Sequence, residues 1–144
     1  MTALSTENIG AKIIEDVAQF EDILLSFPQV ECPVEHLFGP GIYIRQVWIP
    51  AGTLALGHRH IKGHVSILLS GSMVVAGRDG STMIIRAPAT FLCEPGRKLA
   101  YAIEDTIWQN IYATELTDIA AIEEDTMVKS EQWRSALLAD GGLD

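Results

Sequence analysis

Residues 52–71 read GTLALGHRHIKGHVSILLSG and contain three of the four histidines of the chain. His58 and His60 are two positions apart, so on a β-strand both imidazoles lie on one face. His64 keeps the same parity after a short turn that contains Gly63. Three imidazoles on one face form a donor set that transition metals favour, and they leave coordination positions open. The spacing alone fits a metal site and three exposed turn histidines about equally well.

On both sides of this stretch, short apolar runs rich in Val, Ile and Thr alternate with Gly and Pro turn signals. Runs of this length and spacing predict an antiparallel β-sandwich or barrel. The predicted strands are residues 42–49, 53–56, 64–69, 73–76, 82–86, 90–93, 98–103 and 107–113. The stretch from Gly77 to Gly80 predicts a hairpin turn, because glycine supplies the positive φ. The predicted fold class is therefore all-β.

Both ends of the chain show the periodicity of amphipathic helices. Apolar residues recur every three or four positions from about residue 6 to residue 26, and Phe27-Pro28 ends the pattern. The tail from Glu115 has the same spacing, and Gly141-Gly142 stops it. We expect one domain overall, with an N-terminal helical segment at 1–29, a barrel at 30–114 and a C-terminal helical tail at 115–144.

Composition and charge argue against several classes of partner. The 144 residues carry a net charge of −9, the opposite sign to that of a protein that binds nucleic-acid phosphates. No apolar run approaches the roughly 18 residues of a membrane span. The N-terminus has neither the basic start nor the apolar run of a secretory signal. Cys32 and Cys93 form no CxxC motif and are typical of reduced thiols. We expect a cytoplasmic protein without a nucleic-acid or membrane partner.

The histidine-rich stretch resembles the first cupin motif, which reads Gly, five residues, HxH, three or four residues, Glu, six residues, Gly. Gly52, His58, His60, His64 and Gly71 fall at these positions. Residues 87–96, APATFLCEPG, resemble the approach to the second cupin motif. The chain is similar to small single-domain cupins of bacteria and bacteriophages, which are mainly uncharacterised. The resemblance implies a double-stranded β-helix, or jelly-roll barrel, with a metal inside it and a homodimeric assembly.

The chain departs from the cupin pattern at two ligand positions. His64 stands where the family has Glu, so His58, His60 and His64 would form an all-imidazole set that suits Mn²⁺ less well. The histidine of the second motif is missing, and Leu99 or Tyr101 takes its position. We expect a divalent transition metal, Fe, Zn, Ni or Mn, at the three histidines. The alternative is a degenerate cupin that no longer binds metal.

Tyr101 is the candidate catalytic residue, because its phenol can serve a metal or a substrate. It is equally consistent with a core aromatic. If Glu104-Asp105 is a two-residue turn, Tyr101 pairs with Trp108 across it, and the two rings line a substrate pocket or fill the core.

The strand before the histidines offers two alternating sets of side chains. We expect Gln46 and Trp48 to face the pocket, because the opposite choice would bury Arg45. Gln46 would then need a polar partner, and the alternatives are a metal-bound water, a backbone group or an outward orientation.

Two further groups carry weaker signals. His36 is expected to be structural, in a loop before the first strand. Arg97 and Lys98, together with Arg59 and Lys62, form either a basic cluster at the barrel mouth that attracts a carboxylate or phosphate, or scattered surface charge.

Three functions fit these observations. The first is a metal-dependent cupin enzyme acting on a small molecule, either a dioxygenase or an isomerase, lyase or hydrolase. The second is a metal-free module that binds a small ligand. The third, compatible with either, is a dimeric structural or assembly protein whose terminal helices pack on a partner.

Overall fold

The computed structural model describes residues 17–76 and 81–139. The first part of the predicted N-terminal helix, the hairpin turn at 77–80 and the Gly141-Gly142 stop lie outside these residues.

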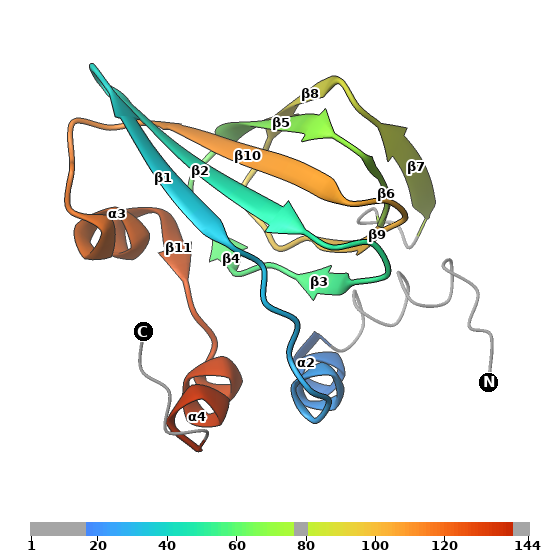
Figure 1. Cartoon of the computed structure of the whole chain (residues 1–144). Helices are drawn as coiled ribbons and strands as arrows, with labels where there is room; N and C mark the ends of the chain where they lie inside the picture. The colour runs from blue at the N-terminus through green and yellow to red at the C-terminus, as the bar shows by residue number, and fades with distance from the viewer. Residues whose placement is uncertain (1–16, 77–80, 140–144) are drawn as a thin grey trace.

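Two antiparallel sheets dominate the structure (Figure 1). In spatial order, the five-stranded sheet contains β1 (Val34–Gly39), β2 (Ile42–Ile49), β10 (Thr106–Ala113), β5 (His64–Ser70) and β8 (Ala89–Cys93). The four-stranded sheet contains β3 (Leu54–Leu56), β9 (Leu99–Ala102), β6 (Ser72–Ala76) and β7 (Thr82–Arg86). The prediction of an all-β barrel is confirmed.

The sequence did not predict three of the strands. β1 was assigned to a loop, and His36 lies on it rather than before the first strand. The other two, β4 (Arg59–His60) and β11 (Met127–Val128), are two residues long and pair with each other. Strands this short carry too little alternation to be recognised in the sequence.

The C-terminal tail forms two helices rather than one. These are α3 (Ile119–Thr126) and α4 (Glu131–Ala139), and β11 separates them. The Asp118 side chain caps α3 by accepting a hydrogen bond of 3.0 Å from the amide of Ala121. In Figure 1, α4 and α2 (Val17–Leu25) lie below β3 and β4 and contact each other, whereas α3 lies to the left, next to β11. None of the described helices is both long and apolar enough to cross a membrane.

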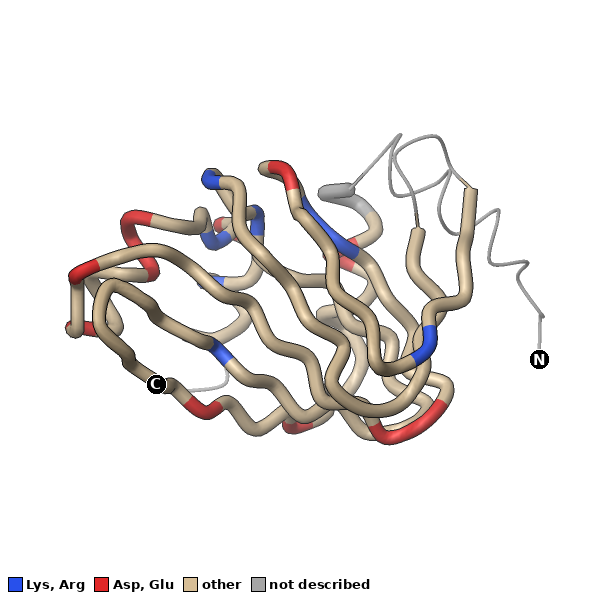
Figure 2. The backbone as a smooth tube through the Cα atoms, turned by 90° about the horizontal axis from the view of Figure 1, so that it is seen from above, with Lys and Arg blue, Asp and Glu red and all other residues tan. Residues whose placement is uncertain are grey.

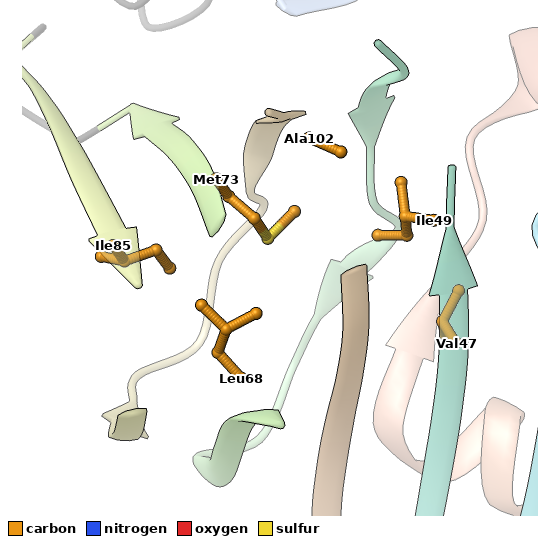
Figure 3. Packing of buried hydrophobic residues seen from close by; sticks show 6 residues of the cluster. All are labelled: Val47, Ile49, Leu68, Met73, Ile85 and Ala102. Carbon is orange, nitrogen blue, oxygen red and sulfur yellow. The ribbon is translucent and has the colours of Figure 1, made fainter. Parts of the chain in front are cut away.

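The hydrophobic core joins the two sheets (Figure 3). Each sheet contributes three buried side chains: Val47, Ile49 and Leu68 from one, and Met73, Ile85 and Ala102 from the other. Apart from Ala102, burying side chains of this size stabilises a fold by roughly 1.5–3 kcal/mol each. A second cluster, made by Tyr43, Tyr112 and Ile122, attaches α3 to the five-stranded sheet.

The second glycine of the histidine-rich motif is required by the fold. Gly71 has a φ of +90° in the tight turn between β5 and β6. A Cβ atom at this position would lie 2.4 Å from the carbonyl oxygen of Asp105. A side chain at position 71 would therefore force apart the two turns that meet at this end of the barrel.

Candidate functional site

A cavity of about 570 Å³ lies inside the barrel and is lined by both sheets and by parts of α2 and α4. This volume is in the range of small-molecule sites. Apolar side chains such as Val47, Ile49, Met73 and Val75 form part of its wall. Among the predicted site residues, it is lined by His58, His60 and Trp108.

Arg45 faces this cavity, which reverses the orientation predicted for β2. The inward set on this strand is Tyr43, Arg45, Val47 and Ile49, and two of its members belong to the core. The prediction was wrong because it assumed that an arginine could not point into the barrel. In the described part of the chain, no ion pair joins Arg45 to a carboxylate.

Gln46 and Trp48 consequently lie on the outer side of β2. Gln46 accepts a hydrogen bond of 2.6 Å from Gln109, its register partner on β10. Trp48 is 36% exposed and lines a separate depression with Pro33 and Ile107. Neither residue lines the barrel cavity, so the prediction that they face it is wrong.

Tyr101 does not pair with Trp108. Tyr101 lies on β9 of the four-stranded sheet, opposite Leu54 and Val74, whereas Trp108 lies on β10 of the other sheet. Glu104-Asp105 therefore belongs to a connection between sheets, not to a hairpin turn. Tyr101 is 41% exposed and is absent from the cavity wall, so a catalytic role for it is not supported.

Trp108 forms an aromatic wall of the cavity. Its ring stacks on Phe91 with a centroid distance of 5.9 Å. The ammonium group of Lys98, another lining residue, lies 5.4 Å from the centroid of the Trp108 ring. The indole Nε1 donates a hydrogen bond of 2.9 Å to Asn110 Oδ1. An apolar ring with a cation beside it is a surface on which a planar or aromatic anion can bind.

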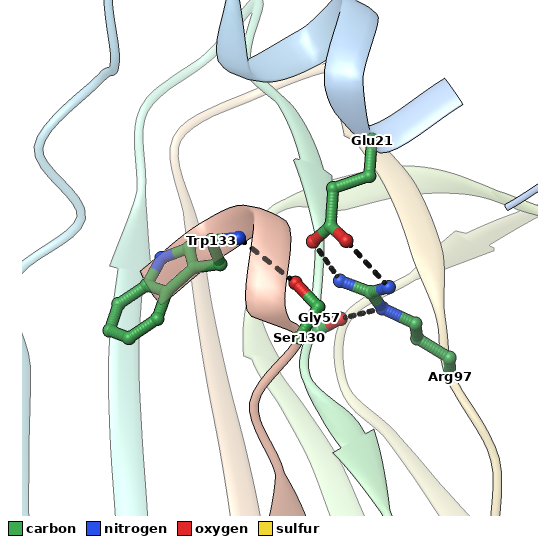
Figure 4. Close-up of polar contacts among 5 residues, drawn as sticks. All are labelled: Glu21, Gly57, Arg97, Ser130 and Trp133. Carbon is green, nitrogen blue, oxygen red and sulfur yellow. Dashed lines mark hydrogen bonds and ion pairs between the residues drawn. The ribbon is translucent and has the colours of Figure 1, made fainter. Parts of the chain in front are cut away.

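Arg97 is fixed at the side of the cavity where α2 approaches the barrel (Figure 4). Its guanidinium holds both carboxylate oxygens of Glu21 in a bidentate ion pair, and its Nε donates to the Gly57 carbonyl at 2.6 Å. Burial raises the pKa of Glu21, but hydrogen bonds from Arg97 and Ser130 outweigh it and leave the pKa lowered. Glu21 is the one acidic residue among the described residues that line the cavity.

The predicted basic cluster is therefore divided by the fold. Arg97 and Lys98 line the cavity, whereas Arg59 and Lys62 do not. Lys62 forms an ion pair of 2.6 Å with Asp125, and both side chains are about half exposed. Such a surface pair contributes little to stability.

His58 and His60 line the cavity as neutral imidazoles at pH 7. Burial is the main reason that the pKa of His58 falls to about 4, and the charges of Lys129 and Arg45 lower it further. Burial also lowers the pKa of His60 to about 3, with contributions from His64 and Lys98. The positive charge of the site therefore comes from its arginines and its lysine.

The three predicted metal ligands have different surroundings. The His58 ring packs edge-on against Trp133 of α4, with a centroid distance of 4.8 Å. His60 and His64 stack on each other at 4.6 Å, and His60 Nδ1 is hydrogen-bonded to the Tyr112 hydroxyl. His64 Nδ1 lies 3.2 Å from the Lys62 carbonyl oxygen.

This arrangement does not fit a resident metal ion. Across residues 17–76 and 81–139, no group of three or more His, Cys, Asp or Glu side chains is placed to hold one. His60 Nδ1 is hydrogen-bonded to Tyr112, so Nε2 is the nitrogen of His60 that could bind a metal. Stacked imidazoles such as His60 and His64 present their faces to each other, whereas ligands must direct ring nitrogens at one point.

Comparison with solved structures identifies the fold. No family model and no curated protein matches the sequence. Ectoine synthase from P. lautus is 15% identical with a TM-score of 0.53, and the match covers 73% of this chain and 83% of that one. An RmlC-like cupin family protein with a double-stranded β-helix fold from Methanocaldococcus jannaschii is 17% identical with a TM-score of 0.48, covering 61% and 86%. A cupin superfamily protein from Desulfitobacterium hafniense DCB-2 is 11% identical with a TM-score of 0.48, covering 65% and 87%.

At these identities the likeness concerns the fold alone. It agrees with the topology described above, in which two antiparallel sheets close around a cavity. The chain therefore shares the fold of ectoine synthase from P. lautus, a barrel of antiparallel strands, here with short helices beside it.

Proposed function

We propose that the protein binds a small organic anion in the barrel cavity, through Arg45 and Lys98, without needing a metal. The observation that carries this proposal is the balance of charge in the cavity. Three cations line it, Arg45, Arg97 and Lys98, and Glu21 is the one described acid among the lining residues. Glu21 is paired with Arg97, so the charge of Arg45 has no counterion in the described part of the chain.

A cation without a counterion in a partly buried site is unfavourable for folding alone. It becomes favourable when an anionic ligand enters. The planar guanidinium of arginine suits carboxylates and phosphates, which it holds with two parallel hydrogen bonds. Lys98 would add a second charge beside the Trp108 ring.

The remaining wall indicates the rest of the ligand. Trp108 and the apolar side chains of Val47, Met73 and Val75 suit an apolar or aromatic body attached to the anionic group. The neutral imidazoles of His58 and His60 can donate or accept hydrogen bonds without adding charge. We therefore expect aromatic carboxylates to bind better than inorganic phosphate.

Isothermal titration calorimetry with benzoate, succinate and inorganic phosphate tests the proposal. Arg45→Gln should weaken the binding of benzoate roughly 10- to 100-fold, the effect of losing a hydrogen-bonded charge. The matched control is Arg59→Gln, which removes the same charge from an exposed residue outside the cavity and should leave binding unchanged. Equal affinities for wild type and Arg45→Gln, or no binding of any of the three anions, would contradict the proposal.

The second candidate function is the metal-dependent cupin predicted from the sequence. It is favoured by two buried imidazole nitrogens, His58 Nδ1 and His64 Nε2, which have no hydrogen-bond partner in the described residues. A rearrangement that directed both nitrogens at one point would supply two of the ligands that a metal ion needs. Metal content decides between the two candidates, and that measurement is described at the end of the Discussion.

A further inference from the structure

Two buried tyrosines of the five-stranded sheet each hold a histidine by the same ring nitrogen. Tyr43 on β2 and Tyr112 on β10 are register partners, and both are almost completely buried. The Tyr43 hydroxyl lies 2.6 Å from His36 Nδ1 on β1, and the Tyr112 hydroxyl is hydrogen-bonded to His60 Nδ1 on β4. His60 is part of the cavity wall, whereas His36 is not. Of the two contacts, only that of Tyr112 therefore acts on the site.

The direction of the Tyr112 hydrogen bond follows from the chemistry of the two groups. A phenol is protonated at pH 7, and burial raises the pKa of Tyr112 further. Its O–H needs an acceptor, because a buried donor without a partner is unfavourable for folding. Among the described residues, His60 Nδ1 is the partner that the structure gives this hydroxyl. The phenol therefore donates the hydrogen bond and Nδ1 accepts it.

This direction decides where His60 carries its own proton. A neutral imidazole has one N–H and one acceptor nitrogen, so His60 carries its proton on Nε2 when Nδ1 accepts. Nε2 has no hydrogen-bond partner among the described residues, and it is not one of the buried unpartnered nitrogens, which belong to His58 and His64. It is therefore accessible, on a residue that lines the cavity. His60 thus offers the cavity an uncharged N–H donor.

The described cavity wall offers this donor no free anionic acceptor. Figure 2 shows the acidic residues mainly outside the strands. Glu21, the one acid among the described lining residues, is paired with Arg97. The amide oxygen of Asn110 already accepts hydrogen bonds from Ser66 and Trp108. A ligand that fills the cavity therefore either brings the acceptor or leaves the donor without a partner, which weakens its binding.

The acceptor is a different group from the ligand's carboxylate. In the proposed function, on which this step rests, Arg45 and Lys98 bind that carboxylate. A guanidinium that holds a carboxylate uses both of its oxygens. Both cations lie close enough to His60 for their charges to lower its pKa. The carboxylate and the acceptor for His60 are therefore neighbouring parts of one small ligand, and an uncharged N–H suits an uncharged carbonyl oxygen.

We propose that Tyr112 is a positioning residue that holds His60 as a hydrogen-bond donor toward the ligand. The ligand is then an organic acid with an uncharged carbonyl oxygen close to its carboxylate, and this oxygen accepts from His60 Nε2. A metal ion at His60 would need the opposite tautomer, with the proton on Nδ1 and a lone pair on Nε2. The tautomer of His60 therefore also separates the two candidate functions.

Nuclear magnetic resonance measures the tautomer without any ligand. Long-range proton–nitrogen correlation spectra of the nitrogen-15-labelled full chain distinguish the protonated ring nitrogen from the unprotonated one. At pH 7, wild type should carry the His60 proton on Nε2. Tyr112→Phe should lose this preference for one tautomer. Phenylalanine keeps the ring that packs against Tyr43 and Ile122, so the variant should retain the wild-type circular dichroism spectrum.

The matched control is Tyr43→Phe. It removes an equally buried hydroxyl from a histidine, His36, that lies outside the cavity wall. This variant should leave the His60 proton on Nε2. A proton on Nδ1 of His60 in wild type would overturn the proposal, and so would an unchanged tautomer of His60 in folded Tyr112→Phe.

Calorimetry with phenylglyoxylate and phenylacetate tests the ligand. The two acids differ in having a carbonyl or a methylene group between the ring and the carboxylate, and EDTA in the buffer prevents chelation of a metal by the former. Wild type should bind phenylglyoxylate roughly tenfold more tightly, the effect of one additional hydrogen bond. Tyr112→Phe should bring this ratio close to one and leave the affinity for phenylacetate unchanged. Tyr43→Phe should keep the wild-type ratio.

The contradicting outcomes differ in what they leave standing. Equal affinities for the two acids in wild type, both weakened by Arg45→Gln, would overturn the donor role of His60 and keep the anion site. A tenfold ratio that survives in folded Tyr112→Phe would overturn the positioning role of Tyr112. If neither acid binds, the anion site itself is contradicted, and the assignment of the ligand falls with it.

Discussion

The inner and outer faces of the five-stranded sheet differ in the kinds of side chain that they carry. Beside its core residues, the inner face holds the Arg45 guanidinium, the His64 imidazole and several hydrogen-bonded polar groups, whereas the outward residues of β2, β10, β5 and β8 are uncharged and mostly apolar. The inner polar groups satisfy one another: Ser66 and Trp108 both donate to Asn110 Oδ1, at 2.7 and 2.9 Å. Polar groups held among the core residues of the inner face fit a protein that binds a ligand within the barrel.

The largest difference between the two faces should appear at neighbouring residues of β5. Leu68 is completely buried in the core, whereas Leu69 is 48% exposed on the outward side of β5. Leu68→Ala should lower the free energy of unfolding by about 3 kcal/mol, because it leaves a cavity. Leu69→Ala should lower it by less than about 0.5 kcal/mol within a single chain. Urea unfolding at low protein concentration, where no dimer contributes, measures both. Equal losses of unfolding free energy in the two variants would mean that Leu69 contributes to the core as much as Leu68 does.

A smaller effect should come from the two histidines that line the cavity. The folded-state pKa values of about 4 for His58 and about 3 for His60 lie below their ordinary value of 6.5. Below pH 6.5 the unfolded chain takes up protons that the folded chain does not, so the free energy of unfolding falls with decreasing pH. Between pH 6.5 and pH 5 the loss is at most about 2 kcal/mol per histidine, and solvent in the open cavity reduces it.

Histidine variants distinguish the unfolding free energy lost through the two histidines from that lost through other titrating groups. His60→Gln should reduce the pH dependence of stability, and the double variant His58→Gln/His60→Gln should reduce it about twice as much. Urea unfolding at pH 7 and pH 5 provides the comparison. If the double variant loses as much stability as wild type, the histidines of the folded protein are not held neutral by burial.

Much of the fold could be predicted from the sequence because turns and strand spacing are local signals. All eight predicted strands exist, and each begins and ends within one residue of the expected bounds. The tail was harder to predict, because Asp118 and the pairing of β11 with β4 interrupt one apolar periodicity. That pairing joins residues almost seventy positions apart, and no local pattern encodes it.

The site was less predictable, since alternation divides a strand into two faces without saying which one is inside. For β2 the choice rested on the cost of burying Arg45, and that rule fails where a charged residue lines a cavity. The pairing of Tyr101 with Trp108 failed because the chain crosses between sheets at Glu104-Asp105. Glu21 carried no recognisable signal, because its partner Arg97 is 76 positions away.

The central claim is that the cavity recognises a ligand through its cations rather than through a metal. Elemental analysis with native mass spectrometry tests it most directly, on untagged protein purified without chelator. We expect no stoichiometric metal, and a complex with added benzoate that forms in wild type and fails to form in Arg45→Gln. Stoichiometric Fe, Zn, Ni or Mn that disappears in a His58→Ala/His60→Ala variant would contradict the claim and establish the three-histidine metal site instead.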